Sequence, residues 1–277
     1  MHLVRRNEVQ VYHTQLFLEE TITSYESQGA TGEWRDHLRF ALDICNGGIF
    51  LRPSQLWHEE IVRGRRTSAM RLLPTRRHRD YGSSPDLVRE LRQLSKTGDL
   101  SAEYRDSMQE RAELFQKKKA QRAIAGDMRR DIENALRDRR LTVPLSTAKF
   151  EDTISQALIE TGKQIMRQVD ARRAVALGEM WAKRPADFPF YTAFVEGLIY
   201  HQFHAMFEHN KKIDVNAQAD YEQLAYLLWA DVFVSNDAKF QRDAFDTLWK
   251  PRGKHMETVE SFASLLATRS AETSSAG

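Results

Sequence analysis

A short run of β-branched and aromatic residues, Val232-Phe233-Val234, constrains the fold most, because it predicts a buried strand with an acid on each side. Before this strand, residues 214–229 carry apolar side chains at helical spacing. After it, Asp237 stands at a helix N-cap position. The apolar stripe of that second helix consists of Phe240, Ala244, Phe245 and Leu248. Helix, strand and helix in this order predict an open α/β sheet, which binds ligands at the carboxyl ends of its strands.

The segment from Asp220 to Asp237 places one acid on the first helix and the other at the end of the strand. Its closing triplet, Ser235-Asn236-Asp237, follows the strand directly. This arrangement resembles the third and fourth acidic motifs of PIN-like domains, a family of metal-dependent nucleases in which the strand ends in Ser/Thr-x-Asp. The resemblance covers only the C-terminal part of the chain. It implies an α/β fold with a parallel sheet flanked by helices.

The N-terminal part is similar to the start of that family in its order of strand and helix, but it lacks the family's first acid. Residues 9–19 predict a strand that runs into a helix. PIN-like domains open with Asp-x-Asn, whereas this chain has His13-Thr14-Gln15. Either His13 serves as a ligand in place of the acid, or the site has lost a member. A further alternative, which we rank lower, places the opening motif at residues 42–46, Leu-Asp-Ile-Cys-Asn.

A second strand is predicted over residues 47–54, and it leads into a helix from Gln55 to Arg63 that ends at Gly64. PIN-like domains carry their second acid, a Glu, on this helix. Glu60 fits that place better than Glu59. Because Glu is an ordinary helix former, a purely structural role for this residue is the alternative.

The resemblance implies a site in which side chains bind Mg²⁺ or Mn²⁺, hard ions that prefer oxygen ligands. Two such ions generate hydroxide and stabilise the leaving oxygen of a phosphodiester. The expected catalytic residues are Glu60, Asp220 and Asp237. The expected metal ligands are these three, His13 and Asp231. Asp231 has a structural alternative, in which it caps or orients the strand. Ser235 and Asn236 are expected to support the site, with Ser235 holding a ligand or phosphate oxygen.

Residues 62–80 form the basic stretch of the chain, because seven arginines face the single acid Asp80. Arginine suits bidentate contacts with phosphate better than lysine does. The residues expected to contact nucleic acid are Arg63, Arg65, Arg66, Arg76 and Arg77. A solvated loop without a ligand is the alternative, to which we give equal weight.

The charge-rich middle of the chain predicts helices without strands, including one from Asp152 to Lys183. We therefore expect four regions: the first part of the PIN-like core over 1–84, an α-helical insertion over 85–185, the second part of the core over 186–267, and a disordered tail over 268–277. The insertion is expected to serve either as a substrate clamp or as a dimer surface. The sequence does not decide between them, so a homo-oligomer is one of the alternatives. The aromatic run 188–207 predicts a helix buried in the core, not a membrane span.

Composition sets further limits. The 277 residues carry 41 Lys and Arg against 39 Asp and Glu, a net charge of +2, so overall charge alone does not indicate nucleic acid. Cys45 is the single cysteine, which excludes an internal disulfide and suits a reducing compartment. The N-terminus lacks the apolar core of a signal peptide. These features predict a cytoplasmic protein without a membrane partner.

The function expected from the resemblance is that of a metal-dependent endoribonuclease, in which RNA is preferred over DNA by family habit alone. One alternative is a catalytically weakened relative that binds nucleic acid without cutting it. This alternative is favoured by His13, which stands where the family has its first acid. Another is a helical interaction protein without metal, in which the acids are caps and surface charges. The sequence does not decide whether the protein has an inhibitory protein partner.

Overall fold

The computed structural model describes residues 9–14, 36, 37, 39, 40, 49, 50, 53–65, 72, 73, 113, 116, 130, 134, 150–207 and 217–275. The elements of the N-terminal half whose bounds the structure gives are β1 (His13–Thr14), β2 (Ile49–Phe50), α4 (Pro53–Arg63) and β3 (Leu72–Leu73). The next helices are α7 (Phe150–Val169), α8 (Ala174–Lys183), η3 (Pro185–Asp187) and α9 (Pro189–Phe207). The C-terminal elements are α10 (Ala217–Leu224), η4 (Ala225–Leu228), β4 (Val232–Val234), α11 (Phe240–Leu248), η5 (Lys250–Arg252), β5 (His255–Glu257) and α12 (Val259–Ser275).

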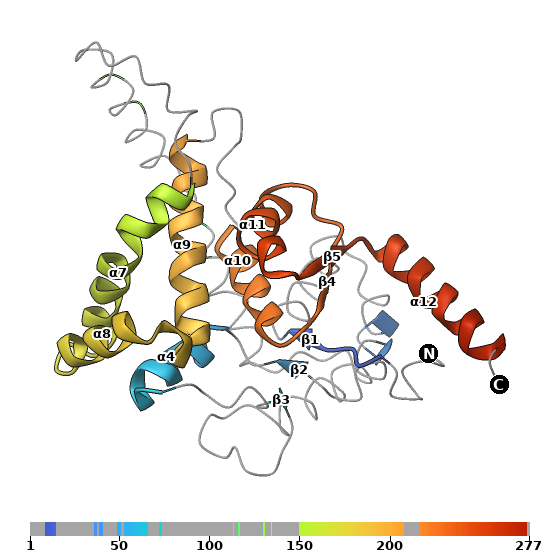
Figure 1. Cartoon of the computed structure of the whole chain (residues 1–277), viewed down its shortest axis with the longest axis horizontal. Coiled ribbons are helices and arrows are strands. Elements are labelled where there is room, and N and C mark those ends of the chain that lie inside the picture. Colours follow the sequence, from blue (N-terminus) through green and yellow to red (C-terminus); the bar gives the residue numbers. More distant parts are fainter. Residues whose placement is uncertain are drawn as a thin grey trace.

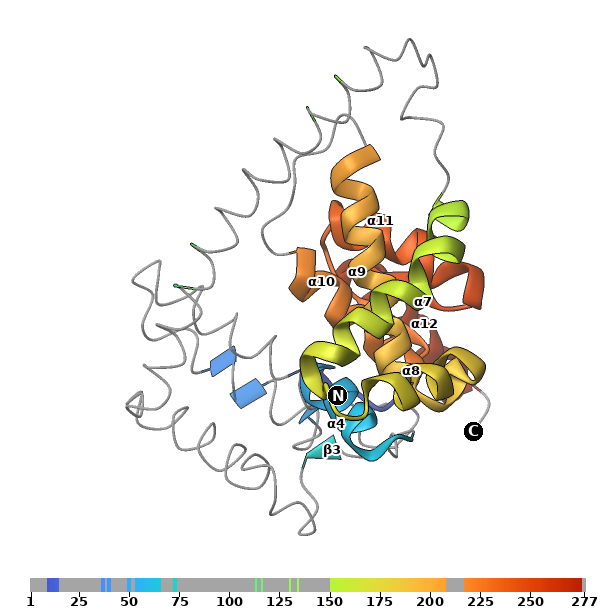
Figure 2. The same ribbon diagram turned by 90° about the vertical axis from the view of Figure 1, so that its left-hand side faces the viewer.

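Helix α9 is the centre of the fold. Helices α4, α7, α10 and α11 all pack against it, and Figures 1 and 2 show it standing between α7 on one side and α10 and α11 on the other. Tyr191, Val195 and Tyr200 on this helix are almost fully buried. A helix that is apolar all round belongs in a core, so the prediction of a buried helix over 188–207 is confirmed. Among the described residues, none of the helices has the length and apolar character needed to cross a membrane.

Within the described part of the chain, the strands form two small sheets. In the first sheet, β1 pairs with β2 in parallel and β2 pairs with β3 antiparallel. In the second, β4 pairs with β5 in parallel, with Phe233 opposite Met256. Each strand has only two or three residues, and helices make up most of the described chain. The expected PIN-like parallel sheet flanked by helices is therefore wrong as a fold class. An apolar run predicts that a strand forms, but the number and direction of its neighbours depend on pairing with distant segments.

Several local predictions are confirmed. The run Val232–Val234 is strand β4, with α10 and η4 before it and α11 after it, although the strand is half-buried to exposed and not buried as expected. The stripe on α11 faces the core, since all four of its apolar side chains are buried. Helix α4 ends at Gly64, whose φ of 64° is the left-handed conformation typical of a helix C-terminus.

The two described helices of the expected insertion, α7 and α8, belong to the same core as α9. Helix α7 packs against α9, α8 and α4. The single helix expected from Asp152 to Lys183 is wrong, because the chain breaks at Asp170–Arg173 and turns back into α8. Trp181 on α8 is fully buried, and its indole N–H donates a hydrogen bond to the hydroxyl of Thr192, 3.0 Å away. At the other end of the chain, α12 continues to Ser275, into the stretch expected to be a tail.

Candidate functional site

Asp237 lies in the turn that follows β4, at the carboxyl end of the parallel pair β4–β5. Its Oδ1 accepts a hydrogen bond of 2.7 Å from the backbone N–H of Lys239. Helix α11 begins only at Phe240, and its N-cap residue, Lys239, makes no side-chain cap. Asp237 therefore closes an Asx turn instead of capping the helix as its position in sequence predicted. Its second oxygen, Oδ2, has no hydrogen bond to any part of the chain that the structure describes.

The two residues before Asp237 hold this turn in place. The hydroxyl of Ser235 accepts a hydrogen bond from the Asp237 backbone N–H, and the Ser235 N–H donates to the carbonyl of Glu257 on β5. The side-chain oxygen of Asn236 accepts from the backbone N–H of Val259, at the start of α12. The supporting positions predicted from sequence thus fix the backbone around Asp237.

Asp231 lies at the other end of β4 from Asp237. Its side chain is 93% exposed and stands 3.6 Å from the ammonium of Lys254. Its carbonyl accepts a hydrogen bond from the backbone N–H of His255, which begins β5. The Asp231 backbone therefore takes part at the start of the β4–β5 pairing, at the end of β4 opposite to Asp237.

Asp220 lies in the first turn of α10 and is half-buried. An acid is favourable there because the N-terminus of a helix carries partial positive charge. Helix α10 packs against both α9 and α11. The structure therefore places Asp220 on the helix that leads toward β4, where the sequence predicted it.

Glu60 is fully buried on α4, and its Oε2 accepts a hydrogen bond of 2.9 Å from the backbone N–H of Tyr191. Tyr191 lies in the first turn of α9, where backbone N–H groups have no partner within the helix. The negative charge of Glu60 also faces the positive end of the α9 dipole. These contacts explain why the core tolerates an acid, and they give Glu60 a structural role that the sequence offered only as an alternative.

His13 lies on β1, where it pairs with Ile49 of β2. Its side chain is largely withdrawn from water, and this burial lowers the pKa of the imidazole below the ordinary value of 6.5. A neutral imidazole is the form that binds metal ions. His13 therefore has the protonation state, at neutral pH, that its predicted role requires.

The structure does not gather the predicted ligands into a metal site. Its described residues, which include His13, Glu60, Asp220 and Asp237, contain no group of three or more His, Cys, Asp or Glu side chains arranged to hold a metal ion. Asp237 Oδ2 offers one oxygen donor of the kind that Mg²⁺ and Mn²⁺ prefer. A site for either ion stays a prediction.

Two of the predicted nucleic-acid contacts, Arg63 and Arg65, lie at the end of α4. Arg63 pairs with Glu59, and Arg65 is exposed. The N–H of Gly64 donates to the carbonyl of Ile61, and that of Arg65 donates to the carbonyl of Glu60, the bonding pattern of a Schellman cap. This cap turns the chain sharply and leaves Arg65 in solvent. The other predicted contacts, Arg66, Arg76 and Arg77, lie outside the described residues.

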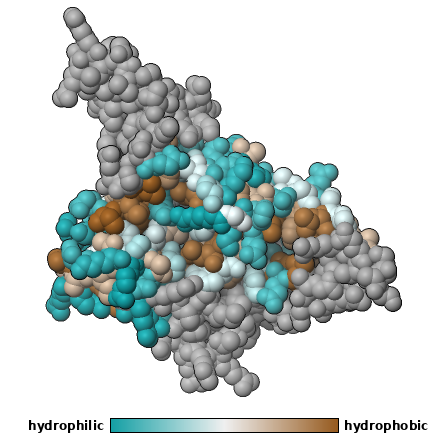
Figure 3. Space-filling view, in the orientation of Figure 1, coloured by the Kyte–Doolittle hydropathy of each residue, from teal (hydrophilic) through white to brown (hydrophobic). Residues whose placement is uncertain are grey.

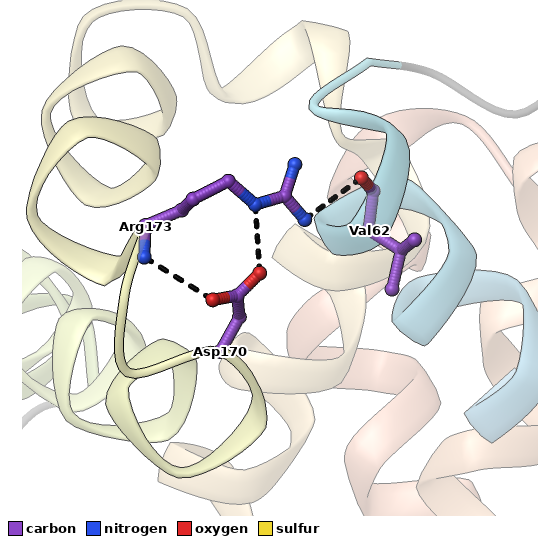
Figure 4. Close-up of polar contacts among 3 residues, drawn as sticks. All are labelled: Val62, Asp170 and Arg173. Carbon is purple, nitrogen blue, oxygen red and sulfur yellow. Dashed lines mark hydrogen bonds and ion pairs between the residues drawn. The ribbon is translucent and has the colours of Figure 1, made fainter.

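Another arginine, Arg173, lies in the α7–α8 turn and binds the end of α4 (Figure 4). Its Nη2 donates a hydrogen bond of 3.0 Å to the carbonyl of Val62, and its Nε donates one of 2.7 Å to Asp170 Oδ2. The Arg173 backbone N–H donates to Asp170 Oδ1. Sequence reasoning missed this contact because it treated Asp170–Arg173 as helix interior. The available signal was an acid and an arginine three residues apart between two apolar stripes.

Comparison with protein-family models, with curated proteins and with solved structures finds no match to this chain.

Proposed function

We propose that the protein is a metal-dependent endoribonuclease that cleaves phosphodiester bonds of RNA. The observation that carries this proposal is the position of Asp237. Its carboxylate follows the carboxyl end of a parallel strand pair, one oxygen is fixed by the Lys239 N–H, and the other is free of hydrogen bonds within the described residues. Carboxyl ends of parallel strands are where α/β sheets bind ligands.

The neighbouring residues have distinct roles in this proposal. Ser235 and Asn236 hold the turn, so that the Asp237 carboxylate keeps one orientation. Asp220 and His13 are the further donors that a divalent ion would require, with Glu60 as the third. A bound Mg²⁺ or Mn²⁺ would supply activated water and stabilise the leaving oxygen. The preference for RNA follows only from the resemblance of the acidic motifs.

A second candidate function is binding of nucleic acid without cleavage. It is favoured by two observations: an imidazole stands where the first acid is expected, and the Glu60 carboxylate already binds the start of α9. A site with fewer free carboxylates holds Mg²⁺ less strongly. The two candidates differ in whether the bound strand is cut.

The experiment is cleavage of a labelled single-stranded RNA in Mg²⁺ and in Mn²⁺. Imidazole suits Mn²⁺ better than Mg²⁺, so the wild type should cut faster in Mn²⁺. Asp237→Asn should reduce cleavage to background. Asp246→Asn is the matched control, because Asp246 is an exposed acid on α11 that pairs with Lys250, and it should leave cleavage unchanged. His13→Asp should raise cleavage in Mg²⁺.

The nuclease proposal is rejected if the wild type cuts RNA in neither metal, or if Asp237→Asn cuts as fast as the wild type. Thermal unfolding with and without Mn²⁺ gives an independent readout. A ligand of the folded state raises the melting temperature, and the rise should be smaller in Asp237→Asn. RNA binding without cleavage, and without a Mn²⁺ shift, supports the second candidate.

A further inference from the structure

The end of α4 and the α7–α8 turn form one surface. The Arg173 guanidinium lies 3.0 Å from the Val62 carbonyl, and Arg65 follows Val62 by three residues along a tightly capped turn. Arg172 is the chain neighbour of Arg173. Arg167 lies in the last turn of α7, just before the same break. Two segments more than a hundred residues apart in sequence therefore present arginines side by side.

The arginines of this surface divide into two groups. Arg63 and Arg173 are held internally, by Glu59 and by Asp170 respectively. The remaining arginines are exposed, and among the described residues they have no ion pair or hydrogen-bonded side-chain partner: Arg65, Arg167 and Arg172. Glu59 and Asp170 are thus already engaged by Arg63 and Arg173. Three positive charges are left facing solvent.

We infer that this surface, formed by Arg65, Arg167 and Arg172, binds the phosphate backbone of single-stranded RNA. Separate charges on two segments, the end of α4 and the α7–α8 region, match a chain of phosphates better than one isolated anion. Guanidinium groups remain charged at all relevant pH values and bind phosphate oxygens bidentately. Figure 1 shows the end of α4 and the α7–α8 turn at the left of the molecule, with β4 and β5 farther to the right, and Figure 3 shows hydrophilic residues along the lower left. The surface thus contacts a part of the strand remote from Asp237.

This inference rests on the proposed function for its choice of RNA, but its charge argument is independent of cleavage. It also gives the helices expected to form an insertion a role as part of the substrate clamp. Arg173 contributes indirectly, because it fixes the α7–α8 turn against α4.

The test compares RNA binding by the full chain with that of two charge-matched variants, using a fluorescein-labelled oligouridylate in EDTA so that no cleavage occurs. The double variant Arg65→Gln/Arg172→Gln removes two unpaired cations. The control Arg184→Gln/Lys250→Gln removes two exposed cations that already pair with Asp187 and Asp246. Far-ultraviolet circular dichroism and thermal unfolding confirm that each variant folds.

Each phosphate contact with a single strand changes the slope of log K against log salt by about 0.7. The test variant should therefore bind more weakly, with a slope shallower by about 1.4, and the control should keep the wild-type slope. Equal slopes for the test variant and the wild type, or an equal loss in the control, overturn the inference.

The outcomes also separate this inference from the nuclease proposal. If the protein binds RNA through these arginines but does not cut it, the binding surface is supported and the nuclease proposal is rejected. If the protein cuts RNA in a metal-dependent way and Arg65→Gln/Arg172→Gln leaves RNA binding unchanged, the nuclease proposal is supported and the binding surface is rejected.

Discussion

Gly197 lies within α9, where Tyr221 of α10 packs against its backbone. A Cβ atom at this position would lie 2.8 Å from Tyr221 Cγ and 3.1 Å from Tyr221 Cβ, closer than carbon atoms pack. Tyr221 is itself buried in the core, and this burial raises the pKa of its hydroxyl. Gly197→Ala should therefore lower the free energy of unfolding by about 1–3 kcal/mol, measured by urea denaturation.

Gly178 provides the matched control, since it also lies inside a helix. A Cβ at Gly178 would meet the flexible side chain of Lys163, which can change rotamer. Gly178→Ala should be neutral or stabilising by up to about 1 kcal/mol, because Ala favours helix over Gly. If both substitutions have the same effect, the close packing of α9 on α10 does not determine the stability at Gly197.

At the residue scale, the sequence placed individual side chains well where a local pattern determines them. It identified Gly64 as the end of α4 and the apolar stripe of α11. It did not identify the partner of Glu60, because Tyr191 lies 131 positions away and backbone N–H groups leave no trace in a sequence pattern. The same limit applies to the contact between Arg173 and Val62.

Arg173 joins three elements, since it lies at the start of α8, pairs with Asp170 after α7, and binds the last turn of α4. Arg173→Gln should lower the free energy of unfolding by about 1 kcal/mol through loss of the hydrogen bond to Val62. Amides at the end of α4 should exchange their hydrogens faster. Arg172→Gln is the control: its neighbouring, exposed side chain makes no such bond, and it should change neither quantity.

The ion pair also gives this contact a pH dependence. The hydrogen bond from Arg173 lowers the pKa of Asp170 below its ordinary value of 3.8. A carboxyl group with a lowered pKa in the folded state stabilises the fold above its unfolded value, and this stability is lost as the pH falls through the lowered pKa. Acid unfolding should therefore separate the wild type from Arg173→Gln above pH 3.8, and the difference should shrink at lower pH. A constant difference would show that the pair does not contribute.

At the scale of elements, the sequence predicted helices and strands better than it predicted their breaks. The strand β4 and the buried helix α9 follow from their composition. The break between α7 and α8 contains no Pro or Gly, the residues by which helix ends are usually recognised, so Asp170–Arg173 was assigned to a continuous helix. The turn is stabilised by Asp170 and Arg173 themselves, which also favour a helical i, i+3 pair.

At the scale of the whole molecule, the expected parallel sheet is wrong because it was inferred from short strand patterns and from a resemblance of motifs, neither of which determines how strands pair. Two parallel pairs are present, but each has strands of two or three residues, and β3 runs antiparallel to β2. The core is instead built from helices that pack around α9, which is buried among them. Strand order and sheet size depend on distant pairings, whereas an aromatic helix indicates its own burial.

Glu60 links the N-terminal part of the chain to this helical core, and its substitution tests what the link contributes. Glu60→Gln retains an oxygen that accepts from the Tyr191 N–H but removes the charge facing α9. Glu60→Leu has a similar volume and removes the acceptor, which leaves a buried N–H without its partner. Glu60→Leu should therefore destabilise the protein by about 1–3 kcal/mol more than Glu60→Gln, measured by urea denaturation.

The same pair of variants separates structure from catalysis. If Glu60 acts only by holding the start of α9, Glu60→Gln should keep both the fold and any metal-dependent cleavage of RNA. If it is also a ligand, Glu60→Gln should stay folded and lose cleavage, because a neutral amide binds divalent ions weakly compared with a carboxylate. Equal stability of Glu60→Gln and Glu60→Leu would contradict the link itself. It would mean that the hydrogen bond from the Tyr191 N–H to residue 60 does not contribute to the free energy of unfolding.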